Sequence, residues 1–172
     1  MRLHKILQTS KAVLLLSFVA VVIFSCNRKI VFSDYKSLSG SKWHQDSILR
    51  FDMTVPDSSK IYNLYLNVRN EGRYGYSNLW LFVKITPPKG KVLNDTIELS
   101  LANPDGKWLG YGLGDIYDMK YPYKQTTIFP SAGYYRFEVR QGMRTEDGVL
   151  KGIRDFGTVS YTHLTLPTNR EV

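Results

Sequence analysis

The sequence predicts an all-β protein, an antiparallel β-sandwich or jelly-roll-like fold, preceded by the signal peptide of a lipoprotein. Three observations support this prediction. Several stretches alternate apolar and polar residues, which is the period-two pattern of half-buried strands. Turn-forming sequences such as residues 103–106 (NPDG) separate these stretches at short intervals. No helical apolar period lasts for three turns after Cys26.

The predicted strands follow one another along the chain with short turns between them. In residues 48–55 (ILRFDMTV), the set Leu49, Phe51, Met53 and Val55 alternates with a mostly polar set, so one face of this strand is expected to be buried. The same reasoning predicts strands at residues 48–55, 61–70, 79–86, 93–101, 121–129 and 134–141, with a short first strand at residues 30–32. The glycine-rich residues 107–118 are expected to form an irregular loop.

The N-terminus has the three parts of a secretory signal peptide. Basic residues precede an uncharged apolar run at residues 12–24, which is shorter than the roughly 20 residues that a membrane-spanning helix needs. Cys26, the only cysteine of the chain, follows almost at once. We therefore expect residues 1–25 to be removed and Cys26 to carry lipid, and two or more acyl chains hold a protein firmly on a membrane. The alternative is a buried apolar helix that happens to contain a cysteine.

The remaining chain divides into three parts. Residues 26–42 are expected to be a lipidated N-terminus and tether, and residues 43–157 to be the β-sandwich, of which residues 142–157 look like a loop. Residues 158–172 do not fit this pattern, because the sequence VSYTHL resembles the translated end of a sequencing-library transposon. We expect these residues to be a non-native adapter scar. The alternative is a genuine C-terminal strand.

Composition excludes several classes of function. The net charge of +8 is spread along the chain without a Lys/Arg stripe, so no nucleic-acid partner is expected. Apart from histidines in the signal and in the tail, His44 is the only histidine, and it is predicted to lie on the surface. With Cys26 used for lipid, no catalytic residue, no metal site, no cofactor and no small-molecule substrate are expected. Asp115 and Asp118 are the alternative, as a glycosidase pair or as calcium ligands.

Aromatic residues are concentrated in two loop regions. Tyr74 and Tyr76 lie in one region, and Trp108, Tyr111 and Tyr117 in the other. Exposed aromatic rings at the rim of a sandwich stack on sugars or become buried in a protein partner, so these five residues are the predicted ligand or partner surface. The alternative is that about half of the aromatic side chains fill the core.

Two short motifs predict modification. Asp46-Ser47-Ile48 and Asp95-Thr96-Ile97 resemble the Asp-Ser/Thr-apolar sites of O-glycosylated periplasmic proteins in Bacteroidota. Ser47 and Thr96 are therefore predicted acceptors of O-linked glycans.

A set of spaced segments resembles the GldH family of gliding-motility lipoproteins from Bacteroidota. No single segment is specific, but their order and spacing are. They are residues 65–70 (YLNVRN), 74–81 (YGYSNLWL), 101–102 (LA), 106–112 (GKWLGYG), 133–137 (GYYRF), 141–144 (QGMR) and 150–155 (LKGIRD).

The resemblance implies a non-enzymatic accessory lipoprotein of the gliding apparatus and the associated type IX secretion machinery. Such a protein would act by binding other proteins of the cell envelope, and only Cys26 receives a functional role from the family. The residues after Cys26 lack an acidic cluster, so we expect a membrane-anchored protein that faces the periplasm. The alternative function is carbohydrate binding by the aromatic residues between Trp108 and Tyr123.

Overall fold

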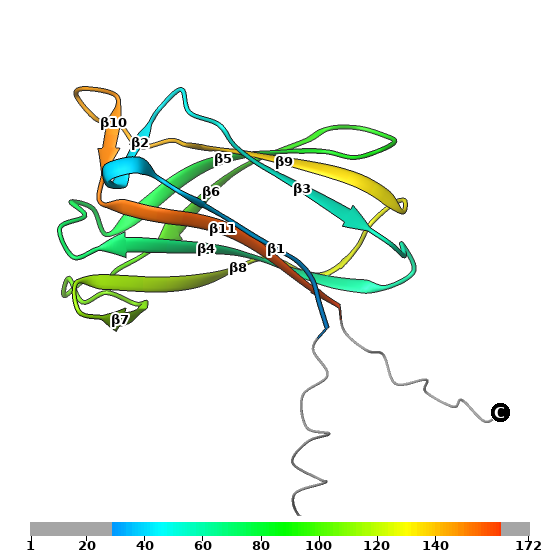
Figure 1. Ribbon diagram of the computed structural model, residues 1–172, viewed down its shortest axis with the longest axis horizontal. Helices are drawn as coiled ribbons and strands as arrows, with labels where there is room; N and C mark the ends of the chain where they lie inside the picture. Colours follow the sequence, from blue (N-terminus) through cyan, green and yellow to red (C-terminus); the bar gives the residue numbers. More distant parts are fainter. Residues whose placement is uncertain (1–28, 163–172) are drawn as a thin grey trace, which may run out of the picture. The chain divides into compact units, whose positions relative to one another are not determined.

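The computed structural model describes residues 29–162, which form two antiparallel β-sheets that pack face to face (Figure 1). The predicted signal peptide and Cys26 lie outside the described residues. Within residues 29–162 there is no helix with the length and apolar character needed to cross a membrane. The all-β sandwich predicted from the sequence is confirmed.

The first sheet has five strands, with the first and last strands of the domain side by side. Its order is β1 (Lys29–Ser37), β11 (Ile153–Thr162), β4 (Ile61–Glu71), β8 (Ile116–Ile128) and β7 (Tyr111–Leu113). The Ser37 hydroxyl donates to Asp155 over 2.5 Å, and the Leu38 amide donates to the carbonyl of Arg154 over 2.8 Å. The end of β1 therefore lies beside the beginning of β11, so these two strands run in opposite directions.

The second sheet has four strands and carries a clear alternation of buried and exposed residues. Its order is β3 (Leu49–Val55), β9 (Gly133–Gln141), β5 (Asn78–Thr86) and β6 (Leu93–Ser100). A short ribbon of β2 (Lys42–His44) and β10 (Val149–Lys151) follows a single 3₁₀ turn, η1 (Ser39–Ser41), at one end of the sandwich. In the second sheet, buried and exposed residues alternate because one face of the sheet meets the core and the other meets water.

Large side chains from both sheets interlock in one core. Phe156 of β11 is fully buried, and its ring centroid lies 5.4 Å from that of Trp43 on β2 and 6.0 Å from that of Phe51 on β3. Aromatic pairs at such distances are favourable beyond the area that they bury. Phe156 therefore joins the first sheet to the second sheet and to the ribbon.

The predicted strands at residues 48–55, 61–70, 79–86, 93–101 and 134–141 are confirmed as β3, β4, β5, β6 and β9, and residues 121–128 as the later part of β8. The prediction for the glycine-rich residues 107–118 is corrected. Instead of an irregular loop, β7 and the start of β8 form a hairpin in which Leu113 pairs with Ile116. Gly114 takes the positive φ of 64° that this tight turn requires.

Both ends of the predicted domain are also corrected. Residues 29–37, predicted as part of a tether except for a short strand, are an edge strand, and residues 42–44 pair with β10. Residues 149–157, predicted as loop, contribute β10 and most of β11. Residues 158–162, predicted to lie outside the fold, complete β11, where Thr158 and Ser160 are buried between β1 and β4. A polar segment is accommodated there because strand pairing satisfies its backbone. The adapter origin of residues 158–172 stays a prediction.

Candidate functional site

Two aromatic side chains are exposed on the outer face of the second sheet. The odd-numbered residues of β5 from 79 to 85 are buried in the core, so the even-numbered ones point outward. Trp80 and Phe82 keep 39% and 42% of their surface exposed. Aromatic rings on a sheet face that no element of the described chain covers are suited to a partner, because burial of such rings dominates binding energies.

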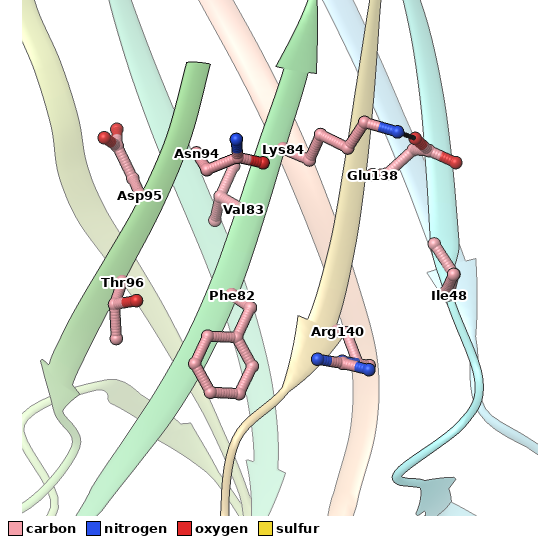
Figure 2. A pocket seen from close by; sticks show the side chains of 9 residues that line it. All are labelled: Ile48, Phe82, Val83, Lys84, Asn94, Asp95, Thr96, Glu138 and Arg140. Atoms are coloured by element: carbon pink, nitrogen blue, oxygen red, sulfur yellow. Dashed lines mark ion pairs between the residues drawn. The ribbon is translucent and has the colours of Figure 1, made fainter. Parts of the chain in front are cut away.

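Phe82 is framed by its neighbours on the adjoining strands (Figure 2). In the strand register it lies opposite Thr96 of β6 on one side and Arg140 of β9 on the other. The guanidinium carbon of Arg140 is 5.2 Å from the centroid of the Phe82 ring, a cation–π distance. The exposed apolar ring is thus presented next to a positive charge.

Ion pairs between neighbouring strands lie on the same sheet face as Phe82. Glu138 on β9 accepts from Lys84 over 3.0 Å and from Arg50 over 3.2 Å, and Arg136 pairs with Asp52 over 2.8 Å. The hydrogen bond from Lys84 and the further one from Arg50 lower the pKa of Glu138, and the hydrogen bond from Arg136 lowers that of Asp52. These carboxylates therefore stay charged at neutral pH and give the face a fixed pattern of alternating charge.

Two hollows adjoin Phe82 and Arg140 on this face. One, of about 380 Å³, is shown in Figure 2. The second has a volume of about 250 Å³. The first is lined by Ile48, Phe82, Val83, Lys84, Asn94, Asp95, Thr96, Glu138 and Arg140, and the second by Gln45, Asp46, Phe82, Arg140, Gln141, Gly142 and Met143. We call the surface formed by Trp80, Phe82, Arg140 and these two hollows the β5 face.

The aromatic surface predicted from the sequence is only partly on the surface. Four of these rings are in contact. The Tyr74 centroid lies 5.7 Å from that of Tyr76 and 6.3 Å from that of Trp108, and the Trp108 centroid lies 5.6 Å from that of Tyr117. Tyr74 is 4% exposed and donates to the carbonyl of Asn78, and burial raises the pKa of its hydroxyl. Tyr74 is therefore a core residue, which corrects its predicted place on a docking surface.

Of the other predicted aromatic residues, Trp108 and Tyr117 are half-buried and Tyr76 is exposed. Tyr111 stands apart from these four rings on the edge strand β7 and is 92% exposed. Of the five predicted aromatic residues, Tyr76 and Tyr111 thus remain as exposed rings on which a sugar could stack. The carbohydrate-binding alternative, which relied on Trp108, gains no support from this arrangement.

The predicted glycan acceptors are both exposed. Thr96 lies beside Phe82 on the β5 face, and Ser47 lies in the turn between β2 and β3. A glycan on Thr96 would cover part of that face. Modification of Ser47 and Thr96 stays a prediction.

The residues weighed for metal binding or acid–base chemistry can now be placed. Residues 29–162 contain no group of three His, Cys, Asp or Glu side chains placed to hold a metal. In the same range, the carboxyl groups with a resolved pKa shift are all shifted downward, which is the wrong direction for a general acid. His44 is exposed, and Asp118 is held in an ion pair with Arg69 over 2.9 Å.

Sequence reasoning missed Phe82 and Arg140. The start of β5 (NLWLFV) is continuously apolar, so the alternation that separates Trp80 and Phe82 from the core residues is hidden. The sequence feature that could have revealed the orientation of β5 is Lys84. Because a lysine points to solvent and side chains alternate along a strand, residues 80, 82 and 84 are expected on the outer face.

Comparison with known proteins identifies the family. The family model described as GldH lipoprotein matches residues 30–159. The chain belongs to the GldH lipoprotein family. It is 38% identical over 156 residues to the gliding motility lipoprotein GldH homolog of Christiangramia forsetii, covering 88% of this chain and 95% of the relative. It is 41% identical over 148 residues to the gliding motility lipoprotein GldH of Flavobacterium johnsoniae, covering 83% of this chain and 91% of the relative.

Solved structures are similar to this GldH-family chain only at a distance. A structure of TmCBM61 in complex with β-1,4-galactotriose has a TM-score of 0.30 and 10% identity, with 77% of this chain and 82% of that chain covered. A structure of arabinose-bound MgGH51 α-L-arabinofuranosidase has a TM-score of 0.34 and 13% identity, covering 80% and 22%. Neither likeness bears on function.

Proposed function

We propose that this chain is a lipid-anchored, non-enzymatic component of the gliding-motility and type IX secretion machinery. It would act by binding another protein of the cell envelope through the β5 face. Membership of the GldH lipoprotein family supports the role in gliding and the attachment to the envelope. Cys26 is the proposed lipidation site, and the periplasm is the compartment that the domain is proposed to face.

One observation carries the proposed site. Phe82 is exposed between Arg140 and Thr96, with the ion pair of Lys84 and Glu138 beside it. An aromatic anchor and an arginine are the residue types that contribute most to protein interfaces. Lys84 and Glu138 pair with each other, so a partner can cover these two residues without burying an unpaired charge. Arg140 has no ion pair within residues 29–162, so the partner is expected to place an acidic group against it.

Site-specific photocrosslinking in envelopes tests the proposal. A photoreactive phenylalanine analogue replaces Phe82 in the lipidated full chain, and in a matched chain it replaces Tyr111, which is exposed on the other sheet. We expect a discrete crosslinked partner from position 82 and none from position 111. Arg140→Ala should weaken the crosslink from position 82. Absence of any specific crosslink from the β5 face would refute this site.

Complementation tests the cellular role. The gene for this chain is expressed in Flavobacterium johnsoniae cells that lack their own GldH, and colony spreading is measured. We expect spreading to be restored by the unaltered chain and lost with Cys26→Ser or with Trp80→Ala/Phe82→Ala. Tyr111→Ala is the control and should behave like the unaltered chain. Full spreading with Cys26→Ser would show that the lipid is dispensable.

A further inference from the structure

The chain termini of the sandwich lie at one end, which we call the anchor end. Thr162 of β11 and Ile128 of β8 lie at the same level, opposite Tyr62 and Ile61 of β4. Because β1 runs antiparallel to β11, its beginning lies at this end too, as Figure 1 shows. The turns at residues 56–60, 87–92 and 129–132 belong to the same end.

Apolar side chains are unusually exposed at the anchor end. Ile30 is 56% exposed, Val92 44%, Leu93 43% and Ile128 61%. Leu93 and Ile128 line one apolar hollow of about 260 Å³, together with Phe129. Exposed apolar groups that gather around one hollow mark interaction surfaces rather than ordinary solvated surface.

The charge of the anchor end is mainly positive. Its three turns contain Lys60, Lys89 and Lys91 and a single acidic residue, Asp57, which pairs with Lys60 over 3.5 Å. Lys89 and Lys91 are exposed and form no ion pair within residues 29–162. Nearby, Lys124 on β8 lines the hollow and pairs with Asp95 over 2.8 Å. Two unpaired lysines beside apolar groups match the chemistry of an anionic membrane surface, where lysine charges meet headgroups and apolar side chains enter the interface.

The length of the linker places this end close to a membrane. Only two residues separate Cys26 from Lys29, the first residue of β1. Three residue steps span at most about 11 Å when fully extended. Resting on the proposed lipidation of Cys26, we propose that the anchor end docks on the membrane surface, with Lys89 and Lys91 against anionic lipid and with Val92, Leu93 and Ile128 at the headgroup boundary. The short linker keeps the effective concentration of lipid high, so weak contacts suffice.

Depth-dependent fluorescence quenching in vesicles tests this arrangement. The lipidated full chain is reconstituted in phosphatidylethanolamine vesicles with phosphatidylglycerol, carrying Val92→Cys labelled with an environment-sensitive dye. Cys26 is the only native cysteine, and in the lipidated chain its sulfur is blocked by the diacylglyceryl group, so the label is unique. The matched chain carries the dye at Tyr111→Cys, which lies at the opposite end. We expect spin-labelled lipids to quench the dye at position 92 and not at position 111.

Charge reversal tests the role of the lysines. Lys89→Glu/Lys91→Glu removes two favourable contacts, each worth about a factor of five to six in binding at an anionic surface, and replaces them with two repelled carboxylates. The ratio of docked to undocked molecules should therefore fall by more than about 30-fold. Quenching at position 92 should fall accordingly. Lys42→Glu/Lys107→Glu makes the same change in net charge at the opposite end, also at exposed lysines without an ion pair in the described chain, and should leave quenching unchanged.

The outcomes separate this inference from the proposed anchor. Protein that does not float with the vesicles refutes lipidation, and the docking proposal with it. Protein that floats but shows equal quenching at positions 92 and 111, or none at either, refutes the docking alone. Quenching at position 92 that survives Lys89→Glu/Lys91→Glu unchanged overturns the electrostatic part of the proposal.

Discussion

Replacement of Phe156 by alanine should remove a large part of the stability of the domain. Phe156 is fully buried in β11 and contacts Trp43 and Phe51. Deletion of a buried phenylalanine side chain costs about 3–5 kcal/mol, because transfer energy is lost and a cavity remains. The total stability of a domain is only about 5–15 kcal/mol. For a domain of this size the loss corresponds to a decrease in Tm of roughly 12–20 °C.

Phe82 provides the matched control, since it is the same residue type but lies on the outer, solvent-facing side of the second sheet. Phe82→Ala removes a ring that is 42% exposed, so we expect a loss of less than about 1 kcal/mol. Both variants are compared in urea, with the lipidated chain in detergent and tryptophan fluorescence as the signal, because Trp43 is fully buried when folded. Equal midpoints for the two variants would refute both the core position of β11 and the outward orientation of Phe82.

Two further predictions concern backbone geometry and pH. Gly152 has a φ of 94°, and an added Cβ would lie 2.8 Å from a backbone atom of the β4–β5 loop. Gly152→Ala should therefore lower the free energy of unfolding in urea by about 2–3 kcal/mol. Gly75→Ala is the control, because an added Cβ would have nothing within 4 Å, and an equal loss of stability in the two variants would contradict this account. The pKa of Glu138 is lowered below its ordinary value of 4.5, so its contribution to the free energy of unfolding is present above that pH and is lost as pH falls through the lower folded value. Lys84→Met should therefore lose less stability than the unaltered chain between about pH 5 and pH 3, whereas Lys89→Met, which removes no ion pair, should keep the original pH profile.

Strands β3, β5 and β9 of the second sheet were predictable because each has one face in the core and one largely in water. In β9, Tyr135, Phe137 and Val139 are buried and Arg136 and Arg140 are exposed, so the period of two is visible in the sequence. The end strands lack that pattern. β11 is buried on both sides of its backbone over most of its length, so its polar residues Thr158 and Ser160 give no sign of strand structure. Pairing between the first and last strands is a tertiary contact that no local pattern reveals.

The candidate site was predictable only in outline. Exposed aromatic residues were expected in loops, where Tyr76 and Tyr111 are found, but the structure places the more enclosed site on a strand face around Phe82. Tyr74 was misplaced because a tyrosine in a glycine-rich loop looks exposed in sequence, whereas its hydroxyl reaches the carbonyl of Asn78 and allows the ring to be buried. A tyrosine is buried readily once its hydroxyl has a partner.

The placement of β1 has a consequence for biogenesis. Among residues 29–162, β1 has β11 as its only neighbour in the sheet, and β11 is the last of these strands to be synthesised. If the chain is exported as proposed, residues 29–37 have no strand to pair with until residues 153–162 have crossed the inner membrane. The N-terminal segment must therefore wait, unpaired, through the translocation of the whole domain. A secretion defect that stalls the chain before β11 should leave this stretch sensitive to added protease, long after the sheet of β3, β9, β5 and β6 has formed.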